Sequence, residues 1–399
     1  MKIDVLYLIS FLLPLVLMPL VLPVFVLLAH RKRIMDSPNA RKLQERPVAV
    51  IGGSVIMLVI CVTSVVVNLF YDITPLFPVL CVMFMLYIFG TIDDTVGMDW
   101  KIKLGLQAFA ITLLFFGSEY GVHLIYGFQW MGVMKLTEVA SMPIWISFPI
   151  TLLCGLLLFN AVNFADGIDG LASVLGILTG LTMGYWHMRH GFEIQTIISL
   201  IMVGVMASFF VFNVFSKRYK IYMGDSGSLV LGLFIYVMVC DNKISMLDGS
   251  FLADNYSLSF VLAVISYMVF DLMRVVLVRT VRRKALYEGD RSHLHHIYVD
   301  LGMNHLMATL VIMLCNMMVI GVWYVTAKNG MPVAPQMVVL ILVAMMLYWL
   351  PYFVVTYLHD KREEKYMALM EGCKRVGMRI DKFVVFVEKI IDRKLKVDN

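Results

Sequence analysis

Charged residues are scarce in this chain. Asp, Glu, Lys and Arg make up 15% of its 399 residues, whereas soluble proteins average about 25%. Apolar residues reach 60%, and the mean hydropathy is +0.84. This combination excludes an ordinary soluble globular protein and predicts a polytopic membrane protein. The net charge of +5 is small, so the distribution of the charges is more informative than their sum.

The chain also lacks a cysteine framework, an internal repeat and a large soluble insertion. Its six cysteines are scattered, five of them in apolar runs and none in CxxC spacing. They are therefore predicted to be small buried hydrophobic residues rather than disulfide or zinc residues. No polar stretch before the C-terminal tail exceeds about 30 residues. We expect one membrane domain over residues 1–358 and a separate cytoplasmic tail over residues 359–399.

Long apolar runs predict an all-α fold. A spanning helix needs about 20 mostly apolar residues, and about eleven runs come close to this length. The first is too long for a signal-peptide core and lacks a small-residue cleavage site, so it should remain as a membrane helix. The runs cover residues 5–29, 48–71, 75–92, 104–117, 143–162, 170–187, 195–215, 227–240, 257–278, 306–327 and 335–358.

Basic residues predict the orientation. Lys and Arg collect in alternate connections, at 30–47, 93–103, 216–226 and 279–305, whereas each of the other connections holds one at most. Connections rich in Lys and Arg stay in the cytoplasm. The N-terminus is therefore expected outside and the C-terminus inside the plasma membrane, with the polar clusters described below on the cytoplasmic face. The basic tail fits equally a helix lying on the inner leaflet and a helix packed on a partner.

Adjacent carboxylates follow the run 75–92. Asp93 and Asp94 repel each other unless a cation or a shared proton compensates, so the pair indicates a divalent metal or a catalytic base, although acidic pairs are also common in loops. Lys103 and Gln107 are four residues apart and should share one helix face. Lys103 fits a lipid headgroup contact or an ordinary positive anchor.

The densest polar stretch runs from Asn160 to Gly170, between two apolar runs. Its amides and carboxylates stand where a helix meets water, which spares them most of the cost of about 2.5–3.5 kcal/mol for a charge at the bilayer centre. Gly167 and Gly170 leave room for a ligand or another backbone. A ligand site is favoured over a simple polar turn.

Two further polar clusters follow. Asp225 opens the run 227–240, where helix N–H groups favour anions; it could cap the helix, but flanking glycines and serines favour a phosphate or metal pocket. Arg291, His293, His295 and His296 lie within the segment 279–305. The histidine spacing does not fit a closed zinc site, so a diphosphate-binding role is favoured over a solvated loop.

Together these clusters supply carboxylates for Mg²⁺ and cations for phosphates on one side of the membrane. They predict phosphoryl transfer to a lipid partner. The alternative is a transporter or scramblase, whose site would lie near the bilayer midplane. Asp271 is the one acid near that depth, and Arg274, one turn further on, could pair with it.

In their order, these motifs resemble the polyprenyl-phosphate N-acetylhexosamine-1-phosphate transferase family (glycosyltransferase family 4), and within it the bacterial undecaprenyl-phosphate N-acetylglucosamine-1-phosphate transferases. The resemblance covers residues 36–358. Two departures are Gln44, where the family usually has His, and the longer stretch 213–220, which lacks a proline. The matching segments are Asp36–Lys42 with Gly52-Gly53, Asp93-Asp94 with Lys103 and Gln107, Asn160–Leu171, Met223–Ser228, and Asp271 with Arg274 and Asp290–His296.

The resemblance implies Mg²⁺, or alternatively Mn²⁺, as cofactor, with a UDP-N-acetylhexosamine and polyprenyl phosphate as substrates in a lipid membrane; nucleic acid is not an expected partner, and a homodimer stays open. The donor is expected to be UDP-N-acetylglucosamine, with UDP-N-acetylmuramoyl-pentapeptide and other UDP-N-acetylhexosamines as alternatives. By the same resemblance, the catalytic residues are Asp93, Asp94, His293, His295 and His296; the metal ligands are Asp225 and Asn163; the substrate-binding residues are Asn160, Asp166, Asp169, Lys103, Arg291, Arg41 and Lys42.

Overall fold

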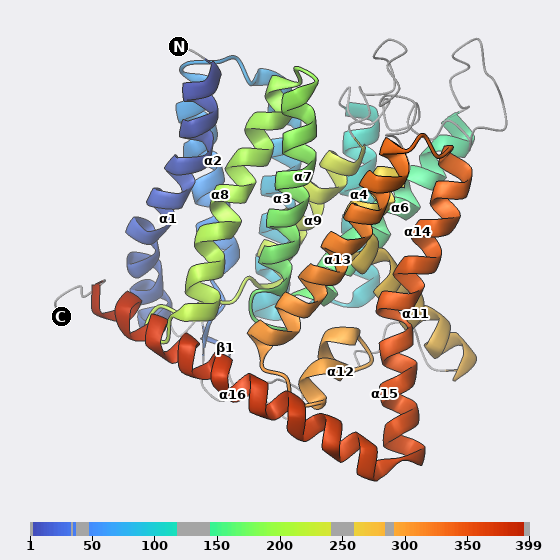
Figure 1. The fold of residues 1–399 in the computed structure, drawn as a ribbon. Helices are drawn as coiled ribbons and strands as arrows, with labels where there is room; N and C mark the ends of the chain where they lie inside the picture. The colour runs from blue at the N-terminus through green and yellow to red at the C-terminus, as the bar shows by residue number, and fades with distance from the viewer. Residues whose placement is uncertain are drawn as a thin grey trace. The chain divides into compact units, whose positions relative to one another are not determined.

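A computed structural model describes residues 3–32, 35–36, 48–117, 144–240, 259–283 and 291–394, and these are helical almost throughout (Figure 1). Its contacts divide the chain into two compact units. The first unit comprises Met1–Ala110, Asp169–Met238 and Ile380–Asn399, and the second comprises Ile111–Ile168 and Val239–Arg379. The units are therefore not consecutive halves of the chain, since each gathers segments that lie far apart in the sequence.

The predicted all-α class is confirmed. Within the described residues, the extended structure amounts to one antiparallel pair of two-residue strands, β1 (Met35–Asp36) and β2 (Val48–Ala49). The first unit contains α1 (Ile3–Lys32), α2 (Gly52–Asn68), the 3₁₀ turn η1 (Thr74–Leu76), α3 (Phe77–Val96), α7 (Leu171–Arg189) and α8 (Glu193–Phe215). The second contains α6 (Ile144–Ala165), α11 (Ser266–Val281), α12 (Leu294–Asp300), α13 (His305–Lys328), α14 (Val333–Tyr348) and α15 (Leu350–Lys361). Residues of both units occur in α4 (Trp100–Gly117), α9 (Gly224–Cys240) and α16 (Glu363–Lys394).

Several helices are long and apolar enough to cross a membrane. Seven spans in the described part of the chain meet this criterion, and α2 and α9 are shorter apolar helices. Each of the eleven predicted runs overlaps a helix, although the last is divided between α14 and α15 at Trp349, two residues before Pro351. A proline removes a backbone donor and so favours such a break. The chain is a multi-pass membrane protein, and the number of eleven spans remains a prediction.

Small residues set the packing of the first unit. Helices α7 and α8 lie side by side (Figure 1). A Cβ added at Gly180 of α7 would lie 2.6 Å from Val203 Cγ2 of α8, and one at Gly184 would lie 2.8 Å from Ser199 Cβ. Glycines spaced four apart on one helix face let two membrane helices approach closely, and dispersion contacts then stabilise the pair.

Buried polar groups tie the second unit together. The Oδ1 atom of Asn316 in α13 accepts hydrogen bonds from Ser266 Oγ at 2.8 Å and from the Tyr267 N–H at 3.1 Å, and its Nδ2 donates to Val264 O. Asn316 is fully buried. Because an unpaired polar group in an apolar interior is costly, these bonds fix α11 against α13 at the level of Tyr267.

The tail forms one long helix, α16, which contacts other parts of the chain. Asp392 accepts hydrogen bonds from Ser216 Oγ at 2.6 Å and from the N–H groups of Lys217 and Arg218, and Phe383 packs edge-on against Phe215. Four apolar side chains repeat every seven residues on a face that stays half exposed: Leu369, Val376, Phe383 and Ile390. The structure tests neither predicted environment of this helix directly.

Five described cysteines have free thiols. The expectation that they are buried is correct for Cys373 but wrong for Cys81, which is exposed on α3. In a multi-pass protein, an outward-facing apolar side chain meets lipid instead of water, so exposure in the isolated chain carries no hydrophobic cost there.

Candidate functional site

A lysine joins two carboxylates in the first unit. Lys103 Nζ lies 2.9 Å from Asp93 Oδ2 and 2.8 Å from Asp225 Oδ1. Asp93 lies in the last turn of α3 and Asp225 in the first turn of α9, while Lys103 lies in the first turn of α4. All three side chains are largely buried, with at most 28% exposed. Three residues that the sequence assigned to one site are therefore in direct contact.

Asp94 has a different environment from Asp93. Its Oδ1 accepts the Asp225 N–H at 2.8 Å, and its Oδ2 accepts the N–H and the hydroxyl of Ser226 at 3.0 and 2.8 Å. The carboxylate thus satisfies free N–H groups at the start of α9, where a negative charge is favoured by the helix dipole. In this structure Asp94 anchors the segment that carries Asp225, and its catalytic role remains a prediction.

Glycines allow α2 and α3 to approach the start of α9. A Cβ at Gly90 of α3 would lie 2.3 Å from Ser226 Cα, and one at Gly53 of α2 would lie 2.3 Å from Ser226 Oγ. Gly224 has φ +68°, and a Cβ there would lie 2.7 Å from Asp94 Oδ2. These close contacts hold Asp225 at its observed distance from α3.

An apolar cavity adjoins the lysine. Eight residues of the first unit line about 220 Å³ of empty space, and they include Asp93, Lys103 and Gln107 together with Leu, Phe and Met side chains. Lys103 and Gln107 share one face of α4, as the sequence predicted. Its walls are mostly apolar, and Asp93 and Lys103 are the charged residues among those that line it.

Asp169 and Asn213 fix the end of the polar stretch. Asp169 Oδ2 accepts a hydrogen bond from Lys220 Nζ at 2.7 Å. Asn213 is buried; its Oδ1 accepts the Gly170 N–H at 2.7 Å, and its Nδ2 donates to Ile221 O at 2.9 Å. Asn213 therefore joins the turn before α7 to the loop before α9. The sequence analysis predicted neither this role nor the pairing of Lys220 with Asp169.

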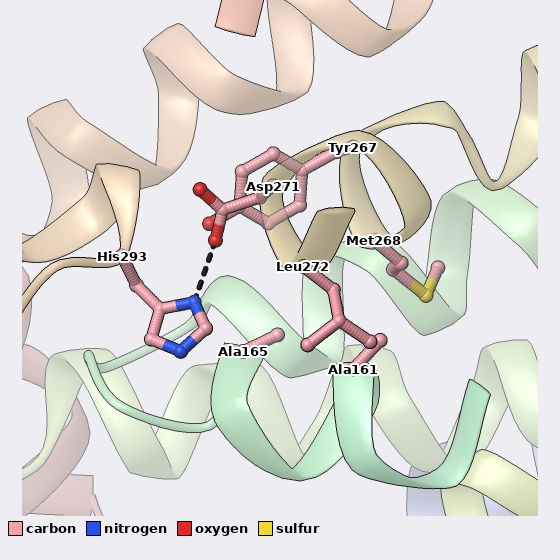
Figure 2. A pocket seen from close by; sticks show the side chains of 7 residues that line it. All are labelled: Ala161, Ala165, Tyr267, Met268, Asp271, Leu272 and His293. Carbon is pink, nitrogen blue, oxygen red and sulfur yellow. Dashed lines mark hydrogen bonds and ion pairs between the residues drawn. The ribbon is translucent and has the colours of Figure 1, made fainter. Parts of the chain in front are cut away.

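The second unit holds a buried Asp–His pair (Figure 2). Asp271 Oδ2 accepts from His293 Nδ1 at 2.7 Å, and Asp271 Oδ1 accepts from Arg274 Nη2 at 2.6 Å and from the Leu294 N–H at 3.0 Å. The predicted pairing of Asp271 with Arg274 is confirmed. The pair lines a small cavity that α6 closes with Ala161 and Ala165. Because Asp271 is paired on both oxygens, it does not present an isolated acid of the kind a transporter relay needs.

The other histidines lie beside this pair. The rings of His293 and His295 are nearly parallel, at 13°, with centroids 5.6 Å apart. His295 Nδ1 lies 3.1 Å from the hydroxyl of Tyr267. Burial lowers the pKa of His295 well below its ordinary value, and it lowers the pKa of His296 to about 4. Within the described residues, the Nε2 atoms of His293 and His295 and the Nδ1 of His296 are buried without a hydrogen-bond partner.

The remaining predicted residues are placed as follows. Asn160 and Asn163 lie in the last turns of α6, and the Asn160 side chain donates to Leu156 O at 2.7 Å. Asp166 follows in the turn after α6. Arg291 Nη2 pairs with Asp300 Oδ1 at 2.5 Å, with both side chains about half exposed. Arg41 and Lys42 lie outside the described residues.

The donor chemistry fits magnesium. No group of three or more His, Cys, Asp or Glu side chains that could hold a metal occurs in the described part of the chain. Mg²⁺, however, is often bound by only one or two carboxylates together with water and substrate phosphates. Asp93 and Asp225 already converge on one cation, the ammonium of Lys103. The carboxylates of Asp93 and Asp225 therefore converge on a position that holds a positive charge.

The fold and these clusters define a multi-pass membrane protein whose acidic, basic and histidine side chains gather at helix ends. Comparison with known proteins shows which family the chain resembles. The model described as "Glycosyl transferase family 4" matches residues 76–242, which include Asp93, Asp94, Lys103, Asp166, Asp169 and Asp225.

Three relatives illustrate the similarity. The "Probable undecaprenyl-phosphate N-acetylglucosaminyl 1-phosphate transferase" of Bacillus subtilis is 25% identical over 307 residues, 77% of this chain and 81% of the relative. The "Undecaprenyl-phosphate alpha-N-acetylglucosaminyl 1-phosphate transferase" of Escherichia coli is 26% identical over 326 residues, 80% and 84% of the two chains. The "Decaprenyl-phosphate N-acetylglucosaminephosphotransferase" of Mycobacterium tuberculosis is 29% identical over 241 residues, 56% and 57%. These matches support the assignment of the chain to the polyprenyl-phosphate N-acetylhexosamine-1-phosphate transferases.

Proposed function

We propose that this enzyme transfers N-acetylglucosamine-1-phosphate from UDP-N-acetylglucosamine to a polyprenyl phosphate and releases UMP. The three relatives above are named for N-acetylglucosamine phosphotransfer to a polyprenyl phosphate. The observation that carries the proposal in this chain is the contact of Lys103 with Asp93 and Asp225 beside an apolar cavity. A lipid phosphate needs this combination of a cation, a base and an apolar wall.

In the proposed reaction, an oxygen of the lipid phosphate attacks the β-phosphorus of the UDP-sugar. The bond from that phosphorus to the bridging oxygen breaks, and UMP leaves with the oxygen and the electron pair. Asp93 takes the proton of the lipid phosphate through Oδ2, the oxygen that faces Lys103 Nζ at 2.9 Å, while its Oδ1 accepts the Met98 N–H at 2.7 Å. Lys103 neutralises charge on the attacking group. The chain thus contributes position and electrostatic stabilisation.

Magnesium is the proposed cofactor, with manganese as the alternative. Asp225 would hold it, with help from Asn163 or from the Asp93–Asp94 pair. The bound ion would neutralise negative charge on the diphosphate.

The nucleotide sugar is proposed to contact the polar stretch after α6, through Asn160, Asp166 and Asp169. His293, His296 and Arg291 would hold the diphosphate, and Arg41 and Lys42 would add positive charge near the nucleotide. His293 suits this role in its doubly protonated form, because Nδ1–H donates to Asp271 while Nε2–H, which has no partner within the described residues, can donate to a phosphate oxygen.

The chemistry is proposed to take place on the cytoplasmic side of a bacterial plasma membrane, with the N-terminus outside and the C-terminus inside. The product, a polyprenyl diphosphate sugar, would start a cell-envelope polysaccharide. UDP-N-acetylmuramoyl-pentapeptide and other UDP-N-acetylhexosamines are the alternative donors. A homodimer is compatible with this scheme.

The test is UMP release by the full-length protein, purified in detergent, with polyprenyl phosphate, Mg²⁺ and a panel of UDP-sugars. We expect the highest kcat/KM with UDP-N-acetylglucosamine. Release that is fastest with another UDP-sugar would reassign the donor, and no release with any UDP-sugar would refute the function.

Variants test the roles within the first unit. Asp225→Asn should abolish Mg²⁺-dependent UMP release, and retained turnover would remove Asp225 from the metal site. Asp93→Asn should remove the acidic limb of the pH–rate profile, because the amide cannot accept the proton. An unchanged profile would exclude Asp93 as the base.

A further inference from the structure

His293 and His295, whose rings stack in the second unit, differ in what lies against the ring edge that carries Nε2. His293 lines the cavity with Asp271, Ala161 and Ala165, whereas His295 is not among the described residues that line it. A Cβ built on Gly167 would lie 2.5 Å from His295 Nε2 and 3.3 Å from its Cδ2. The Nε2–Cδ2 edge of His295 therefore lies against the backbone of the Asp166-Gly167 turn.

The other edge of His295 is held by α11. Tyr267 and Asp271 are four residues apart on this helix and so lie one turn apart on one face. Asp271 receives the Nδ1 of His293 at 2.7 Å, and Tyr267 meets the Nδ1 of His295 at 3.1 Å. A carboxylate can only accept, so His293 donates through Nδ1. A phenol is a stronger donor than a neutral imidazole N–H, so Tyr267 donates to His295.

These partners give the two imidazoles opposite tautomers when both are neutral. His293 keeps its proton on Nδ1, and its Nε2 must carry a second proton before it can donate to a phosphate oxygen. His295 keeps its proton on Nε2, the atom that lies against Gly167. His295 is 1% exposed, and burial also keeps its pKa well below the ordinary value. With Nδ1 on the Tyr267 hydroxyl and Nε2 against Gly167, neither nitrogen of His295 is open to a diphosphate.

We propose that His295, oriented by Tyr267, is a positioning residue that holds the Asp166-Gly167 turn, and that it is not a ligand of the diphosphate. The proposal rests on the function proposed above only in that Asp166 is placed at the nucleotide sugar. It divides the histidine cluster: His293 contacts the substrate, whereas His295 fixes the turn on which Asp166 stands.

The test is a double-mutant cycle on Gly167→Ala and His295→Ala, measured as kcat and KM for UDP-N-acetylglucosamine in the UMP-release assay. Gly167→Ala alone should lower kcat/KM by about tenfold or more, because the methyl group displaces the turn from the ring. Adding His295→Ala removes the ring edge, so the double variant should be more active than Gly167→Ala. If His295 were a diphosphate ligand, His295→Ala would lower kcat/KM by the same factor with and without Gly167→Ala. A double variant less active than either single variant would therefore refute the proposal.

The melting temperatures of the same variants in detergent test the contact between His295 and Gly167 without an activity assay. The double variant should melt higher than Gly167→Ala, even if UMP release failed with every donor; failure of the proposed function and failure of this inference are thereby distinguished. A melting temperature of the double variant at or below that of Gly167→Ala would contradict the contact.

A milder pair of variants tests the orientation by Tyr267. Tyr267→Phe removes only the hydroxyl and should lower kcat/KM several-fold while shifting the Nε2–H signal of His295 in ¹⁵N spectra. Tyr348→Phe is the matched control, because its buried hydroxyl meets Ser266 and Asn316 and its ring touches Tyr267. Equal effects of the two substitutions on kinetics and spectrum would overturn the role of Tyr267.

Discussion

The substitution Gly90→Ala adds one methyl group, which should separate the carboxylates of Asp93 and Asp225 without contacting either carboxylate. Gly90 lies in α3, one turn before Asp93, and faces the start of α9, which carries Asp225. A Cβ at this position would lie 2.3 Å from Ser226 Cα and 2.5 Å from Ser226 N. Both are backbone atoms, so no side-chain rotation can relieve the clash, and α9 must move.

The size of the effect follows from this geometry. Ordinary van der Waals contacts of a Cβ begin near 3.4 Å, so the start of α9 must shift by about 1 Å, and a displacement of that size can lower turnover by about a hundredfold. Overpacking costs about 1–3 kcal/mol, and the gain in helix propensity from Gly to Ala returns about 0.5–1 kcal/mol. Gly90→Ala should therefore destabilise the fold by about 1–2 kcal/mol and reduce turnover far more strongly.

Gly105→Ala is the matched control, since Gly105 lies in α4 and a Cβ there meets no atom within 4 Å. Both variants are compared by melting temperature in detergent and by UMP release at saturating Mg²⁺. We expect Gly105→Ala to behave like the unmodified chain. If Gly90→Ala also kept full turnover, the close packing of α3 on α9 would not set the distance between Asp93 and Asp225, and the reasoning would fail.

Three further outcomes are expected. Asp392→Ala should lower both melting temperature and turnover, because the carboxylate accepts three hydrogen bonds from the loop after α8, whereas Glu371→Ala breaks only an exposed ion pair and should change neither. The pKa of His296 in the folded chain, about 4, lies below the unfolded value of about 6.5. The unfolded chain therefore binds protons first, so the melting temperature should fall from about pH 6.5 to pH 4, and His296→Gln should flatten this fall. Lys103→Met should lower kcat/KM by about a hundredfold or more, whereas the exposed Lys101→Met should not; equal losses would refute the role of the Lys103 contacts.

Helices were the part of the fold that the sequence could predict. Apolar runs follow directly from the need of a membrane chain to bond its backbone internally, and each predicted run overlaps a helix of the structure. The break at Trp349 was not foreseen because hydropathy does not register the backbone donor that Pro351 lacks. The exposure of Cys81 was not foreseen because hydropathy records how apolar a residue is and not which way it faces.

The candidate site was predictable as a set of residues but not as a set of contacts. Asp93, Lys103 and Asp225 were each singled out by local pattern, and the structure joins them. Lys220, by contrast, looked like one more cytoplasmic basic residue, although it pairs with Asp169 at 2.7 Å. A pairing across 51 positions has no local signal, since it depends on how two loops meet.

Asp93 and Asp94 show why the residues alone could not assign roles. The two side chains are chemically identical and adjacent, yet successive positions on a helix point about 100° apart. That rotation turns Asp93 toward the ammonium of Lys103 and Asp94 toward the N–H groups of Asp225 and Ser226. A carboxylate that receives three hydrogen bonds at a helix start holds structure, whereas Asp93, which faces the side-chain ammonium of Lys103 and accepts one N–H, is proposed to take up a proton. The distinction lies in the orientation of α3 and in the packing around Gly90, so it becomes visible only when the helices are placed together.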